Sequence, residues 1–392
     1  MKKLIISILL IATILPLLAQ NEYDTILKEI EVNSTSLNAL REQIEAHKLA
    51  NRTDIFLENP EVEFAYLWGS PSEIGHRINL GITQSFDFPT VYGYRNKISK
   101  LENASVELMY KSERMNLLLE AKQACIELVY YNALTKEYTG RVDNARQIAE
   151  AYKIRLDKGE TNIIESNKAQ LNFITVNNEL ERIGIEQKSV LSKLKSINGG
   201  KDIVINNSVF EDALLPQSFD EWYSQTESKS PVLQYVSSQL DINNQQIKLN
   251  KAASLPKLSA GYTSERVTGE AFQGVAIGVS IPLWENKNKV KQAKMQAKAT
   301  ETALLDNKVQ FYNNLQNLYT KSSGLQQSTL KYRQALSSYN NNNLLKKALE
   351  AGEISLLEYL LEIEYYYDAV DKALESERDF QLSLAELWAV EL

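Results

Sequence analysis

Few residues in this chain have the types and spacing that catalysis or metal binding requires. The 392 residues include one cysteine and two histidines, too few for an internal disulfide or a metal cage of cysteine and histidine. His47 and His76 have no cysteine or second histidine at ligand spacing. Residues 199–202, Gly-Gly-Lys-Asp, lack the other elements of a phosphate loop and are typical of a helix stop. We therefore expect no enzyme, no cofactor and no resident metal.

The residues best placed for chemistry are acidic, and they occur in two similar motifs. Residues 158–165 read Lys-Gly-Glu-Thr-Asn-Ile-Ile-Glu, and residues 351–358 read Ala-Gly-Glu-Ile-Ser-Leu-Leu-Glu. Each motif ends in a glutamate, Glu165 or Glu358, six positions after its glycine. Carboxylates attract cations, but the spacing of Ser355 and Glu358 is also that of a capping box that stabilises a helix start. Both interpretations remain open for these two glutamates.

The two motifs belong to an internal duplication of the chain. They lie 193 residues apart, and the same offset relates Pro89 to Pro282, each of which ends an alternating segment. The pairs Asn59-Pro60 and Leu255-Pro256 open another strand-like segment in each half, at an offset of 196. We therefore predict two copies of one arrangement: helix, two strands, long helix, turn and second helix.

Each copy is predicted to contain a strand hairpin, at residues 61–88 and 257–281. The segments have the length and the two-sided pattern of tilted strands that cross an outer membrane. The same alternating pattern is equally typical of two hairpins in a soluble sheet, whose apolar face packs on a core. The residues expected on the apolar faces are Val62, Phe64, Tyr66, Trp68, Ile78, Leu80, Ile82, Phe86, Phe88, Leu258, Ala260, Tyr262, Val275, Ile277, Val279 and Ile281.

Long helices favour the membrane interpretation. Residues 94–157 and 287–351 contain no proline and almost no glycine, so each stretch can form one helix of roughly 65 residues and about 95 Å. Second helices, at about 162–197 and 355–390, are expected to run antiparallel to them across turns at Gly159 and Gly352. Both glycines are predicted to end a helix with positive φ. Rods of this length cannot fold back over a four-stranded sheet.

The predicted strands also imply an oligomer. Four strands cannot close, and unpaired backbone groups in lipid cost several kcal/mol each, whereas single-chain barrels begin at about eight strands. Three chains would supply twelve strands.

The start of the chain and its charge indicate the compartment. Lys2 and Lys3 precede an apolar run, followed by Pro16 and a small-residue end at Ala19, which predicts a secretory signal peptide at residues 1–19. No cysteine lies near that junction to carry a lipid. The formal net charge of −7 and the lack of a basic excess indicate that the chain has no nucleic-acid partner.

The chain as a whole resembles the TolC-like outer-membrane efflux factors. The resemblance rests on the duplicated plan, on Gln-Ser-Phe-Asp-Phe-Pro at 84–89 and Val-Ser-Ile-Pro-Leu at 279–283 leading into long helices, and on the two glycine motifs. It implies a mainly α fold in which long antiparallel helical hairpins form an α-barrel. Four strands per chain would contribute to a twelve-stranded β-barrel of a homotrimer.

The resemblance also implies a function. The chain would be an outer-membrane exit duct with a periplasmic helical extension, passively conducting substrates in a tripartite efflux or type I secretion system. Its partners would be a periplasmic adaptor, an inner-membrane pump such as a resistance-nodulation-division transporter, and outer-membrane lipid. The alternative is a soluble periplasmic coiled-coil adaptor or structural protein.

The resemblance assigns residues to three regions. The tyrosine and arginine that lock the aperture in some relatives are replaced by Leu156 and Thr161 in the first copy and by Leu349 and Ile354 in the second. The aperture and adaptor contacts would be Gly159, Glu160, Glu165, Gly352, Glu353 and Glu358. The strand-to-helix junctions would be Pro89 and Pro282, and the membrane-interface aromatics Tyr66, Trp68, Tyr92, Tyr262 and Trp284.

The expected domain organisation follows the duplication. After the signal peptide, the first repeat runs over residues 20–198, with a helical hairpin at 93–197. An equatorial connector occupies 199–218, and the second repeat runs over 219–392, with a helical hairpin at 285–390.

Overall fold

The computed structural model describes residues 22–210 and 214–392, so the predicted signal peptide lies outside the described residues. The chain divides into two compact units. The strand unit comprises Ser36–Leu117, Asp212–Lys331 and Asp379–Leu392. The hairpin unit comprises the chain up to Thr35 with Leu118–Glu211 and Tyr332–Arg378. Each unit is described by itself below.

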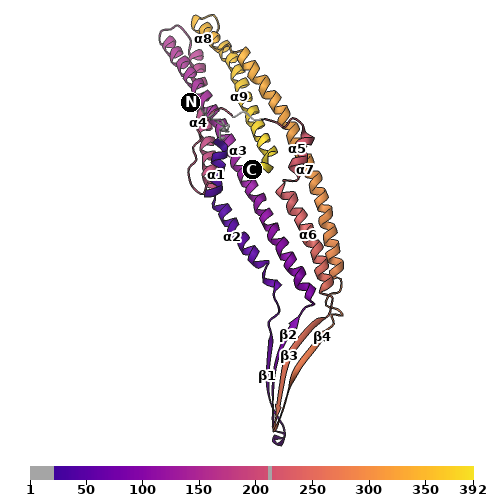
Figure 1. The fold of residues 1–392 in the computed structure, drawn as a ribbon. Helices are drawn as coiled ribbons and strands as arrows, with labels where there is room; N and C mark the ends of the chain where they lie inside the picture. Colours follow the sequence, from indigo (N-terminus) through magenta and orange to yellow (C-terminus); the bar gives the residue numbers. More distant parts are fainter. Residues whose placement is uncertain (1–21, 211–213) are drawn as a thin grey trace, which may run out of the picture. The chain divides into compact units, whose positions relative to one another are not determined.

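The strand unit contains one antiparallel sheet of four strands in the order β1-β2-β3-β4 (Figure 1). The strands are β1 (Glu61–Trp68), β2 (His76–Phe86), β3 (Lys257–Val267) and β4 (Glu270–Ser280). The register places Phe64 opposite Leu80, and Ile82 opposite Tyr262, which in turn pairs with Val275. Because residues directly opposite one another share a face, the predicted apolar sets of all four strands form one continuous apolar face.

The helices of the strand unit all join this sheet at one end, opposite the β1–β2 and β3–β4 turns (Figure 1). They are α2 (Thr35–Ala50), the first part of α3 (Pro89–Asp157), α5 (Phe219–Glu227), α6 (Pro231–Ala252) and most of α7 (Lys289–Ser338), with short 3₁₀ turns at Thr53–Ile55 and Ser72–Ile74. An aromatic core packs α5 against α7 and the C-terminal segment. In that core the Phe219 ring lies 5.5 Å from the Tyr319 ring, and the Trp222 ring lies 5.5 Å from the Trp388 ring.

The hairpin unit is built from long helices. It contains α1 (Glu22–Asn33), the second part of α3, α4 (Ile163–Ile197), α8 (Asn342–Ala351) and most of α9 (Leu356–Leu387); a 3₁₀ turn at Ala389–Glu391 closes the chain within the strand unit. The core of the hairpin unit joins both helical hairpins, because Ile148 and Tyr152 of α3 and Ala169 of α4 pack with Leu356 and Tyr359 of α9.

The prediction of one long helix is confirmed in the first copy and wrong in the second. Helix α3 has 69 residues, about 100 Å, whereas the stretch predicted as one helix over 287–351 is broken between Ser338 and Asn342. Residues 340–343 are four consecutive asparagines. Asparagine side chains compete for backbone hydrogen bonds, and the Asn342 amide here donates to Asn340 Oδ1 at 3.3 Å. This competition interrupts the helix.

Two helix starts also differ from the prediction. Helix α7 begins at Lys289, after an irregular segment at 281–288 in which Asn288 has a φ of 66°. The single helix expected ahead of the first strands is two helices, α1 and α2, separated at Ser34.

Candidate functional site

The two helical turns of the hairpin unit have the same backbone geometry. Gly159 and Gly352 adopt φ values of 73° and 74°, as predicted from the sequence. Each turn closes with the same pair of bonds: Glu160 N donates to Arg155 O at 2.8 Å and Glu353 N to Ala348 O at 2.9 Å, while each glycine N–H donates three residues back. This is the Schellman arrangement, which requires a left-handed residue at the glycine position.

Glu165 and Glu358 both act within their own helix starts. The Glu165 amide donates to the Asn162 side chain at 3.0 Å, and its carboxylate accepts a hydrogen bond from Lys168 at 2.8 Å. Glu358 forms the predicted capping box: its carboxylate accepts from the Ser355 amide at 2.7 Å, and its own amide donates to Ser355 Oγ at 3.2 Å. The hydrogen bond from the Ser355 backbone holds the pKa of Glu358 below its usual value.

Glu160 and Glu353 occupy equivalent positions directly after the two glycines. Both side chains are exposed, and within the described part of the chain neither carboxylate forms an ion pair or a hydrogen bond. The sequence placed them in the same group as Glu165 and Glu358. The structure separates the two pairs, because only Glu160 and Glu353 have carboxylates without a local partner.

A buried ion pair that the sequence did not reveal joins α3 to α9. Arg141 Nη2 lies 2.6 Å from Asp371 Oδ1, and Nη1 lies 2.9 Å from Oδ2, a bidentate geometry. The guanidinium carbon lies over the rings of Tyr138 and Tyr367, at 4.3 and 4.4 Å from their centroids. The Arg141 side chain is 4% exposed. No pattern in the sequence marks a pair whose members are 230 residues apart.

A cavity of about 560 Å³ lies beside this ion pair, between α3, α4 and α9. Its wall includes Asn144, whose side chain donates to the Tyr359 hydroxyl at 2.8 Å, and the partly exposed Leu357 and Leu361. The groove therefore offers both polar and apolar surface.

The predicted interface aromatics occupy different levels of the strand unit. Trp68 ends β1 and is 80% exposed, and Tyr66 stacks on His76 at 5.6 Å near the same turn. Trp284, 79% exposed, follows β4 at the opposite end of the sheet. Tyr262 is the middle residue of β3 and donates a hydrogen bond to Gln273 Oε1 at 2.8 Å.

The strand-to-helix junction of the first copy is organised by a buried carboxylate. Asp87, just after β2, is paired with Arg95 at 2.8 Å and with Lys257 of β3 at 3.6 Å. The Asp87 amide donates to the Tyr92 hydroxyl at 3.0 Å. Tyr92, predicted as an interface aromatic, is therefore bonded into the junction.

The junction prolines differ between the copies. Pro89 is the first residue of α3, the helix position where a proline costs nothing. Pro282 lies in the irregular segment ahead of α7.

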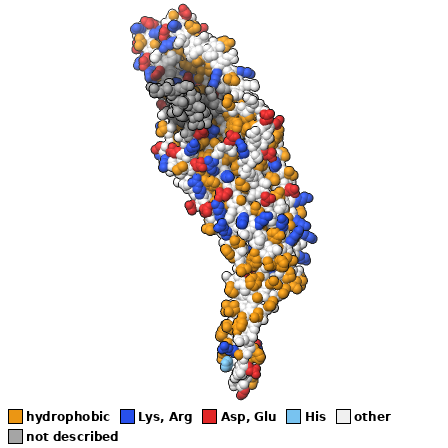
Figure 2. All heavy atoms as spheres, in the orientation of Figure 1, with side chains coloured by type: hydrophobic (Ala, Val, Ile, Leu, Met, Phe, Trp, Pro, Cys, Tyr) orange, Lys and Arg blue, Asp and Glu red, His pale blue; other side chains and the backbone are white. Residues whose placement is uncertain are grey.

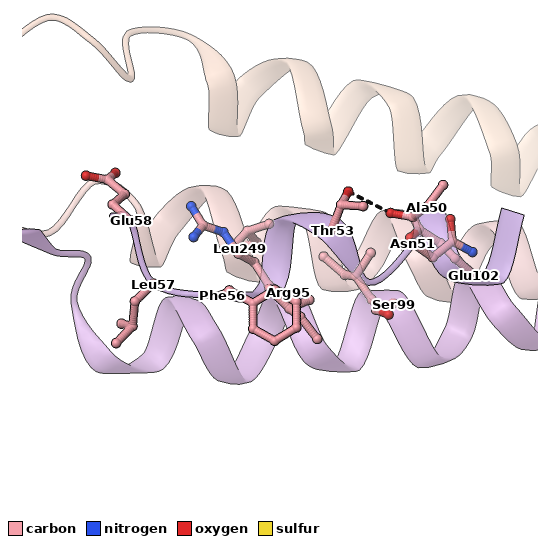
Figure 3. Close-up of a pocket in the computed structure, with 12 residues that line it drawn as sticks. Ala50, Asn51, Thr53, Phe56, Leu57, Glu58, Arg95, Ser99, Glu102 and Leu249 are labelled. Carbon is pink, nitrogen blue, oxygen red and sulfur yellow. Dashed lines mark hydrogen bonds between the residues drawn. The ribbon is translucent and has the colours of Figure 1, made fainter. Parts of the chain in front are cut away.

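A second cavity, of about 750 Å³, lies at this junction (Figure 3). Its lining comes from the end of α2, the segment leading to β1, the start of α3, and Leu249 of α6. Glu102 is part of the lining, and burial raises the pKa of its carboxyl group. Phe56 and Leu57 contribute exposed apolar surface at the mouth.

The described residues contain no group of three or more His, Cys, Asp or Glu side chains placed to hold a metal ion.

None of the described helices combines the length and the hydropathy that a membrane-crossing helix needs.

Comparison with known proteins identifies the second half of the chain. Residues 222–389 match the sequence profile of the family described as outer membrane efflux protein. The second half of the chain is therefore similar in sequence to outer membrane efflux proteins. The matched segment covers α5 to α9 with β3 and β4, which are the elements of the second copy. No curated protein matches the chain closely enough in sequence to count as a relative.

Solved structures share the fold of nearly the whole chain. CusC has a TM-score of 0.80 at 15% identity, covering 94% of this chain and 92% of its own. The CmeC outer membrane channel of Campylobacter jejuni has a TM-score of 0.78 at 15% identity, covering 94% and 85%. The outer membrane protein VceC of Vibrio cholerae has a TM-score of 0.76 at 14% identity, covering 94% and 95%. The predicted TolC-like fold is confirmed.

Proposed function

We propose that this chain is the outer-membrane exit duct of a tripartite efflux or type I secretion system. Three copies would form one barrel in the outer membrane and one helical tunnel in the periplasm. Substrates would pass by passive conduction, since the energy comes from an inner-membrane pump. The sequence match to outer membrane efflux proteins favours this function over a soluble periplasmic adaptor or a structural coiled coil.

The observation that carries the proposal is the open sheet of the strand unit. Its four strands present one continuous apolar face, with Val275 and Ile277 of β4 79% and 83% exposed. The opposite face is mostly polar or small and includes Glu63, Asn79 and Thr263. Leu67, Val267 and Phe272, close to the turns of the two hairpins, are its apolar exceptions. Strands β1 and β4 each have one edge without a partner in the described chain. An apolar face in lipid and two open edges require closure by further copies.

The helical tips are proposed as the periplasmic end that meets the adaptor. Exposed apolar side chains lie on both helices that follow the glycine turns: Ile163 and Ile164 at the start of α4, and Leu357 and Leu361 on α9. Leu357 and Leu361 are spaced at one helical turn, and exposed apolar side chains of this kind suit packing against helices of a partner. Gly159 and Gly352 would set the shape of this contact surface.

The aperture would carry its charge on Glu160 and Glu353. Three chains would bring six free carboxylates to the tips, and such rings favour cations. Glu165 and Glu358 would contribute mainly by fixing the helix starts, because their carboxylates already have partners.

The duplication supports the proposed domain boundaries. The repeats would run over residues 20–198 and 219–392, joined by an equatorial connector at 199–218. The start of the matched segment at residue 222 lies close to the proposed start of the second repeat.

Planar-bilayer recording of the purified protein, together with cell fractionation, tests the proposal. We expect the protein in the outer-membrane fraction and a detergent-purified trimer that gives discrete conductance steps. Recovery from the periplasm as a detergent-independent monomer would contradict the proposal, as would an intact trimer without conductance.

A further inference from the structure

Seven lysines gather where α6 ends and α7 begins. We call them the basic patch: Lys248, Lys251, Lys287, Lys289, Lys291, Lys294 and Lys298. All seven side chains are exposed, and within the described chain none of their ammonium groups forms an ion pair. Residues 242–264 and 286–300 contain no aspartate or glutamate. Glu285, the acidic residue nearest to Lys287 in the sequence, forms no ion pair with these lysines in the described chain.

The two parts of the basic patch are held together by side-chain bonds to the backbone. Asn250 of α6 donates to the Lys289 carbonyl at 3.2 Å, and Asn286 donates to the Ala253 carbonyl at 2.6 Å. Further along, Asn243 donates to Thr300 at 2.8 Å. The end of α6 and the start of α7 are therefore fixed side by side, which concentrates the seven charges.

The patch opposes the usual charge preference of a helix start. The positive end of the helix dipole favours acidic residues in the first turn, yet α7 has none there and begins with lysines. The arrangement costs the isolated chain stability without a compensating ion pair. An external anion would remove this cost.

The position of the patch identifies the kind of anion. Ile281, Leu283 and Trp284, just after β4, are 65%, 68% and 79% exposed, and Lys287 follows three residues after Trp284. Figure 2 shows this succession on one face of the strand unit: apolar side chains cover the strands, and Lys and Arg side chains gather where the helices begin. A tryptophan between an apolar band and a cluster of lysines is typical of a membrane–water interface.

We propose that the basic patch binds the headgroups of anionic phospholipids in the leaflet that faces the helices. Each lysine near an anionic lipid surface adds attraction, and seven on one surface would hold a layer of anionic lipid around the duct. The proposal rests on the proposed function, because it requires that β4 crosses the membrane.

Native mass spectrometry of the full-length detergent-purified trimer tests the proposal, with phosphatidylglycerol and phosphatidylcholine added at equal concentrations. The patch variant replaces Lys287, Lys289, Lys291, Lys294 and Lys298 by glutamine. The matched control replaces five exposed, unpaired lysines elsewhere on the helices: Lys153, Lys188, Lys321, Lys331 and Lys347. Both variants lose the same charge.

We expect the native protein to retain phosphatidylglycerol in preference, the patch variant to lose about tenfold or more of that preference, and the control to keep it. Equal retention of both lipids by the native protein would overturn the proposal, as would equal losses in the two variants. If the patch variant loses the trimer, the lysines serve subunit contacts instead, which also overturns it. If the patch variant instead changes only the anion selectivity of the conductance, the lysines face the tunnel, again overturning it.

Reconstitution separates this proposal from the proposed function. The native protein and the patch variant are mixed with phosphatidylcholine vesicles and recovered by flotation. If both proteins float with the vesicles and the patch variant loses the lipid preference measured by mass spectrometry, the patch proposal is supported. Failure of the native protein to insert into any vesicle would overturn both the function and the patch.

Discussion

Arg141 of α3 and Asp371 of α9 form a bidentate ion pair, with Nη–Oδ distances of 2.6 and 2.9 Å, that connects the first helical hairpin to the second. The guanidinium also contacts the rings of Tyr138 and Tyr367. Within the hairpin unit, this pair is joined by the apolar cluster around Tyr359 and by hydrogen bonds of Asn144 with Tyr359 and of Lys346 with Gln147 in connecting the two hairpins. A motion that separates α9 from α3 would have to break this pair.

Loss of the Asp371 carboxylate should destabilise the hairpin unit strongly. Asp371→Asn leaves the buried Arg141 without its partner charge, and such losses cost about 3 kcal/mol. The matched control is Asp368→Asn, which removes an exposed pair with Lys372 on the same helix and should cost under about 0.5 kcal/mol. Denaturant unfolding of the native protein and both variants measures these changes in the free energy of unfolding. Equal effects would show that the Arg141 pair is not a structural connection.

The tyrosines around Arg141 should make the hairpin unit sensitive to alkali. Burial raises the pKa of Tyr138 to about 12, and burial likewise raises that of Tyr367 to about 12, from an ordinary value of 10.0. Ionisation is therefore harder in the folded state. The contribution to stability is complete below pH 10 and is lost as the pH rises toward 12.

Thermal unfolding between pH 9 and 12 measures this effect. The double variant Tyr138→Phe, Tyr367→Phe should show a shallower decline than the native protein. A Tyr365→Phe control, at an exposed position on α9, should follow the native curve. Identical curves for all three proteins would contradict the assignment.

The glycine turns should tolerate no ordinary side chain without cost. Gly352→Ala places a Cβ at a φ of 74°, which costs about 1 kcal/mol although nothing lies within 4 Å of the new atom. Gly184→Ala is the control, because Gly184 lies inside α4 with open space around it and alanine favours a helix by about 1 kcal/mol. We predict opposite signs in a thermal-unfolding comparison. A stabilised Gly352→Ala would show that the turn does not need the left-handed conformation.

The free carboxylates at the tips should set the ion preference of the duct. Glu160→Gln with Glu353→Gln removes six charges from a trimer and should lower the cation-to-anion permeability ratio about twofold or more. Glu165→Gln with Glu358→Gln removes the same number of charges that already have local partners, and should change the ratio less. Reversal potentials in a salt gradient measure both. The opposite order would return the aperture role to Glu165 and Glu358.

Much of the fold follows from local sequence rules. The remaining parts depend on packing between segments that are distant in the sequence. The absence of proline predicts α3, and the alternation of side chains predicts strands whose apolar faces align. The four asparagines at 340–343 can be read from the sequence, but whether they interrupt a helix depends on its packing against neighbouring helices. The pairing of Arg141 with Asp371 depends on packing between distant segments, which no local pattern encodes. The sequence pattern likewise does not show that the Glu165 carboxylate has a local partner whereas the Glu160 carboxylate has none.

The proposed barrel requires that the open edge of β1 in one copy pairs with the open edge of β4 in the next copy. Cys125, the only natural cysteine, is buried, so cysteines introduced at Ala65 of β1 and Ala276 of β4 can be read without interference. Within one chain these strands are separated by β2 and β3, about 14 Å, too far for a disulfide.

Oxidation of this double variant and of neighbouring registers, followed by denaturing electrophoresis, tests the claim most directly. We predict covalent dimers and trimers for at least one register and none for either single variant. Monomers alone at every register, from protein that remains folded, would contradict the account.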